Sequence, residues 1–229
     1  MKTLVFDTGP IISLGTNNLF WILEPLKKKF NVRFYITDAV KRELVDKPFE
    51  TKKFKFEAIQ VEKLIEEGVL EIIDNERIRQ QTPILLNKAN EVFKAYNNYM
   101  KIVHYAEMSV IAAALDIKAD AIVIDEKTTR FLIENPDNLI NIFRKTLHTG
   151  IKVNENNLKE FRNYTKGIKT IRSVEIVAIA YEKSLLDIFI TKLPDARKQL
   201  LESILWGVKL NGCAVSKDEI AQIMRIELR

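Results

Sequence analysis

Two short, uninterrupted apolar segments of this sequence each end in an aspartate. Residues 3–6 are followed by Asp7, and residues 121–124 are followed by Asp125. Apolar runs of this length are typical of strands that are buried on both faces, as in a parallel sheet. Ligands of such sheets bind beyond the carboxyl ends of the strands, so both aspartates are expected where a site would form.

Strands and helices are predicted to alternate along the first part of the chain. Residues 32–36 are rich in β-formers, and residues 69–73 form a further apolar segment. Helices are expected near residues 55–67 and 104–116, with one long helix from about residue 83 to residue 100. This order predicts an α/β protein whose parallel sheet is covered by helices on both faces.

The character of the sequence becomes helical after about residue 150. From Ser173 onward, apolar residues recur at helical spacing. Pro194 and Asn211-Gly212 show the asymmetry expected at the start and the end of a helix. We therefore predict one domain over residues 1–150 and an all-helical C-terminal extension over residues 151–229.

Composition limits the class of protein. Hydrophobic residues make up 47% of the chain and charged residues 29%, which is ordinary for a globular protein. With a single cysteine, no intramolecular disulfide can form, which suits the cytoplasm. We expect no membrane association, because no apolar run approaches the roughly 20 residues of a membrane span. The net charge of +5 favours polyanionic partners without identifying one.

Two glutamates are predicted to lie on the apolar sides of their helices. Glu43 shares a face with Val40 and Leu44 by the i, i+3 and i+4 rule. Glu107 lies in the first turn of its helix, on the side that also carries Met108. A buried carboxylate without a partner is unfavourable, so these side chains need a cation or a proton.

The clustered acids indicate a metal site for phosphodiester chemistry. An aspartate that ends one strand more often caps the following turn, so the aspartates alone would not establish a site. Carboxylates without thiolates suit a hard cation, Mg²⁺ or Mn²⁺. Such ions activate water and neutralise charge on a phosphate, and a basic protein would attract that substrate.

Three segments, LVFDTGPIISL, ITDAVKREL and YAEMSVIAAALDIKADAIVIDEKTTR, together resemble the PIN-domain family of ribonucleases. The resemblance covers about residues 1–145. It implies a three-layer α/β/α sandwich and a Mg²⁺- or Mn²⁺-dependent endoribonuclease. Such an enzyme is a hydrolase that cleaves single-stranded RNA by two-metal-type phosphodiester hydrolysis.

The resemblance also assigns the site. Asp7, Glu43, Glu107 and Asp125 match the family's four acids in order, and they are the expected catalytic and metal-binding residues. Glu126 is an expected auxiliary metal ligand. Many members carry a small hydroxyl residue two positions before the last aspartate, whereas Val123 stands there in this chain.

Several alternatives stay open at this level. A catalytically inactive module of the same fold could bind RNA or protein, although it would not need all four acids. Residues 27–30 and 52–56 interleave lysine with phenylalanine, which suits RNA. The competing interpretation is a solvated face whose aromatic rings turn inward. Besides single-stranded RNA, the partner could be a second copy of the chain, forming a homodimer, or an antitoxin-like protein. The role could be that of a toxin or that of an RNA-processing enzyme.

Overall fold

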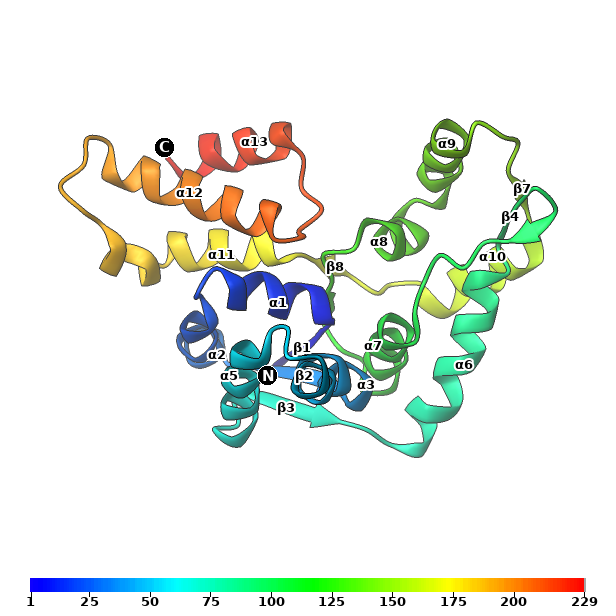
Figure 1. Ribbon diagram of the computed structural model, residues 1–229, viewed down its shortest axis with the longest axis horizontal. Helices are drawn as coiled ribbons and strands as arrows, with labels where there is room; N and C mark the ends of the chain where they lie inside the picture. The colour runs from blue at the N-terminus through cyan, green and yellow to red at the C-terminus, as the bar shows by residue number, and fades with distance from the viewer. Residues whose placement is uncertain (229) are drawn as a thin grey trace.

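A five-stranded parallel sheet forms the centre of the computed structural model, which describes residues 1–228 (Figure 1). The strands lie in the order β3-β2-β1-β6-β8, with parallel pairing throughout. Their bounds are Lys2–Phe6 (β1), Val32–Thr37 (β2), Leu70–Ile73 (β3), Ala121–Val123 (β6) and Thr170–Ile171 (β8). The four strands predicted from the sequence are all present, and the predicted parallel sheet is confirmed.

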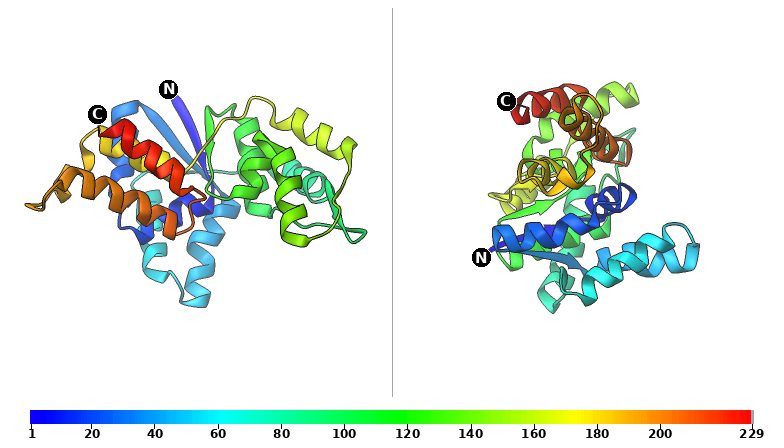
Figure 2. Two further views of the ribbon diagram at one scale, coloured as in Figure 1. Left: turned by 90° about the horizontal axis from the view of Figure 1, so that it is seen from above. Right: turned by 90° about the vertical axis from the view of Figure 1, so that its left-hand side faces the viewer.

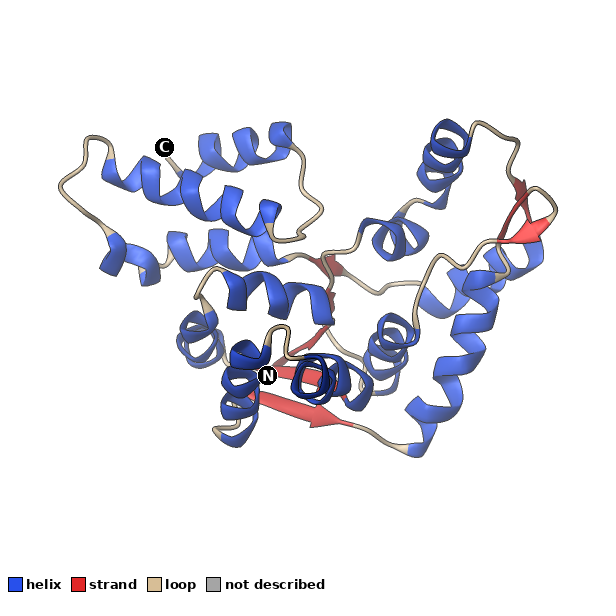
Figure 3. Cartoon of the chain, viewed as in Figure 1, coloured by secondary structure: helices blue, strands red, loops and turns tan. Residues whose placement is uncertain are grey.

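Helices flank the sheet on both faces, which confirms the three-layer fold (Figure 3). In the first 150 residues these are α1 (Thr8–Thr16), η1 (Phe20–Ile22), α2 (Leu23–Phe30), α3 (Asp38–Lys41), η2 (Arg42–Asp46), α4 (Lys47–Thr51), α5 (Lys55–Glu66), α6 (Glu76–Asn90), α7 (Tyr105–Asp116), α8 (Lys127–Glu134) and α9 (Pro136–Leu147). Helix α7 packs against β1, β2 and β6, whereas α2 packs against β2 and α5 against β3.

The C-terminal part is helical, as predicted, with two short strands added. It contains α10 (Glu155–Thr165), α11 (Ser173–Glu182), η3 (Leu185–Phe189), α12 (Ala196–Leu210) and α13 (Lys217–Glu227), together with β7 (Lys152–Val153) and β8. Strand β8 pairs with β6 and so extends the central sheet. Nowhere in residues 1–228 is a helix long and apolar enough to cross a bilayer.

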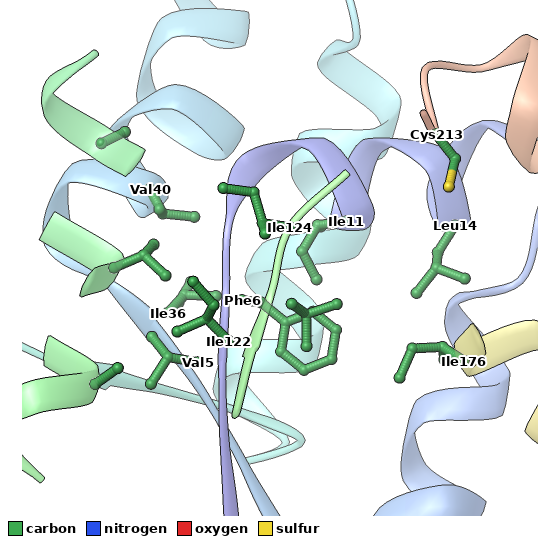
Figure 4. Packing of buried hydrophobic residues seen from close by; sticks show 14 of the residues in the cluster. Val5, Phe6, Ile11, Leu14, Ile36, Val40, Ile122, Ile124, Ile176 and Cys213 are labelled. Atoms are coloured by element: carbon green, nitrogen blue, oxygen red, sulfur yellow. The ribbon is translucent and has the colours of Figure 1, made fainter. Parts of the chain in front are cut away.

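One continuous apolar core joins the sheet to the C-terminal helices. Phe6 and Phe34 meet edge to face on neighbouring strands, with ring centroids 5.2 Å apart. The same cluster extends through Leu14 of α1 to Ile176 of α11 and to Cys213 (Figure 4). The core includes residues from both sides of position 150, and helices α11 and α12 both pack against α1. The division of the chain at that residue stays a prediction.

The long helix predicted over residues 83–100 is wrong. Helix α6 ends at Asn90, and the chain then forms a hairpin of β4 (Phe93–Ala95) and β5 (Asn98–Tyr99), which β7 extends. Tyr96 and Asn97 both have positive φ, at 50° and 64°, as a tight two-residue hairpin turn requires. Phe93 is fully buried, so tertiary packing holds this segment as a strand.

Close packing of α1 predicts a cost for added volume. A Cβ at Gly15 would lie 2.5 Å from Cζ of the buried Phe20. We expect Gly15→Ala to lower the free energy of unfolding by about 1–3 kcal/mol, the usual effect of overpacking. Chemical denaturation would measure this, with Gly150→Ala as control because its Cβ position is free of described neighbours. Equal stability of the two variants would contradict the packing.

Candidate active site

An open cleft lies at the carboxyl ends of β1 and β6. The acids predicted from the sequence all border it, and four small residues together with His104 complete its wall. The lining residues are Asp7, Thr8, Gly9, Glu43, His104, Ala106, Glu107, Asp125, Glu126 and Gly212. The fold therefore brings together residues that are separated by more than a hundred positions in the sequence.

Asp7 follows β1 directly and is one of the two buried acids of the cleft. Its side chain is buried, and its Oδ1 atom has no hydrogen-bond partner among the described residues. Burial, reinforced by the negative charge of Glu107, raises the pKa of Asp7 to about 7. Asp7 is the N-cap residue of α1, yet its side chain makes no capping hydrogen bond.

Glu107 is held by two hydrogen bonds at the start of α7. The backbone N–H of His104 donates to its Oε2 atom at 3.1 Å, and the Thr129 hydroxyl donates to the same atom at 2.8 Å. The side chain is partly buried, and this burial raises the pKa of Glu107. Both donors reach one oxygen, so Oε1 is left without a hydrogen bond in the described structure.

Asp125 is anchored from two directions. The hydroxyl groups of Ser13 and Ser173 donate to Oδ2 at 2.9 and 2.7 Å, and the backbone N–H of Ser173 donates to Oδ1 at 2.7 Å. The Asp125 carbonyl oxygen also accepts a hydrogen bond from the N–H of Ala214. These bonds fix the carboxylate and leave lone pairs on Oδ1 for a further ligand.

The C-terminal segment is therefore part of the site. Ser173 opens α11, and Gly212 lines the cleft. Arg172 ties this region together, because its buried guanidinium bonds the carboxylates of Glu175 and Glu219 and the carbonyl oxygen of Ala214. These contacts hold both C-terminal contributions beside Asp125.

Glu43 reaches the cleft from its rim. The sequence predicts it on or beside the apolar stripe of its helix; it lies next to the buried Leu44, but its own side chain is exposed. The α-helix Asp38–Lys41 continues as the π-helix Arg42–Asp46, whose wider turns break the i, i+3, i+4 relation. The Thr8 hydroxyl donates to its Oε2 atom at 2.7 Å and so orients the carboxylate beside Asp7.

Glu126 has a structural task in addition to its place in the cleft. Its Oε2 atom accepts a hydrogen bond from the backbone N–H of Thr129 at 2.6 Å and so caps α8. One oxygen is thereby committed to the helix. Its expected role as an auxiliary metal ligand stays a prediction that rests on the other oxygen.

Sequence reasoning missed the hydroxyl residues that position the acids. Thr8 bonds Glu43, Thr129 bonds Glu107, and Ser13 and Ser173 bond Asp125. Val123, which stands where many family members carry a hydroxyl, is fully buried in the core. Thr8, Ser13 and Thr129 lie inside segments that the sequence singles out, but nothing local marks them as partners of the acids, and Ser173 lies outside these segments.

The chemistry of the donor set, carboxylate oxygens without thiolates, fits a hard divalent cation. No cationic side chain pairs with Asp7, Glu43, Glu107 or Asp125 within residues 1–228. Across the same residues, no group of three or more His, Cys, Asp or Glu side chains is already assembled closely enough to hold a metal. The unpartnered, buried oxygen of Asp7 is the observation that calls for a cation.

The raised pKa of Asp7 predicts pH-dependent stability of the metal-free protein. Since the folded pKa of about 7 exceeds the ordinary value of 3.8, the stabilising contribution is full below pH 3.8 and is lost as the pH rises through 7. A shift of this size corresponds to about 4 kcal/mol. We expect Asp7→Asn to raise the melting temperature near pH 8 and to flatten its pH dependence.

Melting curves between about pH 5 and 8 in chelator would test this linkage. Glu202→Gln is the matched control, because Glu202 is exposed on α12 and has no part in the cleft. It should retain the wild-type slope. A wild-type slope in Asp7→Asn as well would show that Asp7 is not the titrating group.

The anchoring of Asp125 predicts a metal-affinity defect from a C-terminal substitution. Ser173→Ala removes one of the two hydroxyl donors, and we expect it to weaken Mn²⁺ binding by roughly 10–100-fold. Calorimetric titration would measure the affinity without reference to activity. Ser203→Ala, on an exposed part of α12, is the matched control, and Ser173→Thr should restore binding. Unchanged affinity in Ser173→Ala would mean that the Ser173 hydroxyl does not position Asp125 for the metal.

Comparison with known proteins gives one match. A family model described as DUF3368, a PIN domain, matches residues 3–135, which is more than half of the chain. Searches of curated proteins and of solved structures found no match. PIN domains are generally nucleases and usually use divalent metals, and they often bind RNA and form toxin–antitoxin pairs. The order of acids, the sheet and the matched region agree: the chain belongs to the PIN-domain family.

Proposed function

We propose that this protein is a Mg²⁺- or Mn²⁺-dependent endoribonuclease that cleaves single-stranded RNA in the cytoplasm. The observation that carries this proposal is the carboxylate of Asp7, which is buried, has an oxygen without a partner and has a pKa of about 7. Such a group is unfavourable in a folded protein unless it serves a cation or a proton transfer.

Asp7, Glu107 and Asp125 would hold the metal, and Glu43 would complete or tune the set from the rim. A bound divalent ion supplies water activation and neutralises charge that develops on the phosphate. The chain orients the ligands beforehand, through Thr129 on Glu107 and Thr8 on Glu43. Asp7 would give up its proton when the ion binds, because the positive charge offsets burial and the repulsion from Glu107.

RNA is the proposed substrate on grounds of access and charge. The cleft is open at the surface, so a phosphate of an extended strand can approach the acids. The net charge of +5 attracts a polyanion. The bases of an RNA duplex would hold the backbone in a fixed helix, whereas a single strand can bend into the cleft.

A non-catalytic binding module is the second candidate. It would attract RNA through the same positive net charge, and members of the family often bind RNA or a protein partner. A binding module has no need for a buried acid whose oxygen lacks a partner, and so the enzyme is favoured. The protein could be a toxin-like nuclease restrained by an antitoxin-like protein, or it could process RNA. Both roles would use the same site.

Loss of the Asp7 charge tests the enzyme directly. We expect Asp7→Asn to reduce Mn²⁺-dependent cleavage of single-stranded RNA by at least roughly 100-fold, because it removes a ligand rather than an outer partner. Mn²⁺ should raise the melting temperature of the wild type and not that of the variant. Mapping of cleavage sites on total cellular RNA, wild type against variant, would then identify the target. Equal cleavage by both proteins would refute the assignment.

A further inference from the structure

A basic and aromatic surface lies beside the cleft, in helix α4, the turn that follows it and the start of α5. We call residues 47–56 the basic–aromatic turn. They contain four lysines against one glutamate, and three phenylalanines lie among them. From the sequence, the competing interpretation was a solvated face with its aromatic rings turned inward. The structure separates the two possibilities ring by ring.

Two of the three rings face solvent. Phe56 is 69% exposed and Phe49 is 42% exposed. Only Phe54 is turned inward, where it lines a hollow with Ile11 and Glu43. Its backbone adopts the left-handed conformation, with φ of 60°, which is unfavourable for a residue with a bulky side chain. The inward ring thereby anchors a turn whose other rings have no apolar cover.

The lysines of the turn are not neutralised. Lys47, Lys52, Lys53 and Lys55 are all exposed, and none makes an ion pair within the described residues. Lys55 places its Nζ atom 5.4 Å from the centroid of the Phe49 ring. A cation beside an exposed ring combines the two groups that bind a phosphate and a base.

The other basic–aromatic segment, residues 27–30, differs in charge. Lys27 is paired with Glu71, and Lys28 is paired with Glu24. Most of its positive charge is thus balanced within the protein. It serves as a comparison of similar composition, and it shows that unpaired lysines are not a general property of this surface.

The basic–aromatic turn is continuous with the candidate active site. The π-helix Arg42–Asp46, which carries Glu43, runs directly into α4. Glu43 borders both the cleft and the hollow under Phe54. Figure 2 shows the helices of this region, in light blue and cyan, projecting from the body of the molecule. The basic–aromatic turn therefore adjoins the rim of the cleft at Glu43.

We propose that the basic–aromatic turn binds the single-stranded RNA that occupies the cleft. Bases stack on Phe49 and Phe56, while Lys52, Lys53 and Lys55 neutralise the adjoining phosphates. This inference rests on the proposed function for its choice of ligand. Stacking accepts any base, so the turn contributes affinity and direction of entry rather than sequence preference.

The test measures RNA binding without cleavage. Asp7→Asn protein in chelator is titrated with a labelled single-stranded oligouridylate at several salt concentrations. Three further sets of substitutions are made in it: Phe49→Ala with Phe56→Ala, Lys52→Gln with Lys53→Gln and Lys55→Gln, and, as matched control, Lys29→Gln with Phe30→Ala. All of these side chains are exposed, so the fold should survive, and melting curves would verify this.

Each set has its own expected signature. The phenylalanine variant should bind at least about fivefold more weakly at every salt concentration, since stacking on one ring accounts for that much. The lysine variant should lower the slope of log affinity against log salt by about 2, as expected when three phosphate contacts to a single strand are lost. The matched control should bind as the parent does.

The inference is overturned if both turn variants bind RNA as the parent does, or if the control loses as much affinity. It is also overturned if the turn variants keep RNA binding and lose binding to phosphatidylcholine vesicles that contain phosphatidylglycerol. Failure of the proposed function looks different. Wild type would then not cleave RNA with Mn²⁺, while binding would still depend on the turn.

Discussion

The burial of one unpaired negative charge organises this molecule. Asp7 ends the central strand of the sheet, and the cleft around it offers no cationic side chain among the described residues. A carboxylate in that position is unfavourable by itself, and Glu107 makes it more so. The surrounding hydroxyl groups bond the other acids and leave one oxygen of Asp7 free. The buried, unpartnered carboxylate of Asp7 thus destabilises the folded protein, and a bound cation would offset this effect.

The family match and the site have different extents. The match ends at residue 135, whereas Asp125 is anchored by Ser173 and Ala214. Arg172 bonds three separate parts of the C-terminal segment and keeps these anchors in place. The C-terminal helices are therefore a structural condition of the acid cluster and not only an attachment to it. This also explains how a chain with Val123 can still surround its last acid with hydroxyl groups.

Short-range patterns were sufficient for much of the fold. Four strands followed from apolar runs and from a segment rich in β-formers, and the four acids were assigned from strand ends, helix faces and the family resemblance. The errors arise where tertiary structure decides. Residues 93–99 form a hairpin because Phe93 is buried, and Glu43 is exposed because a π-helix interrupts its face. Ser173 could not be found, since its partner lies 48 positions away.

The dependence of Asp125 on late residues has a consequence for synthesis. A chain emerging from the ribosome presents the sheet strands β1, β2 and β6 well before Ser173 and Ala214 exist. Until those residues are made, Ser13 is the one hydroxyl partner of Asp125 described above that is already present, and the cleft lacks Gly212 from its wall. The anchoring of Asp125 is thus completed only late in translation, about fifty to ninety residues after the sheet strands that carry Asp7 and Asp125 have been made.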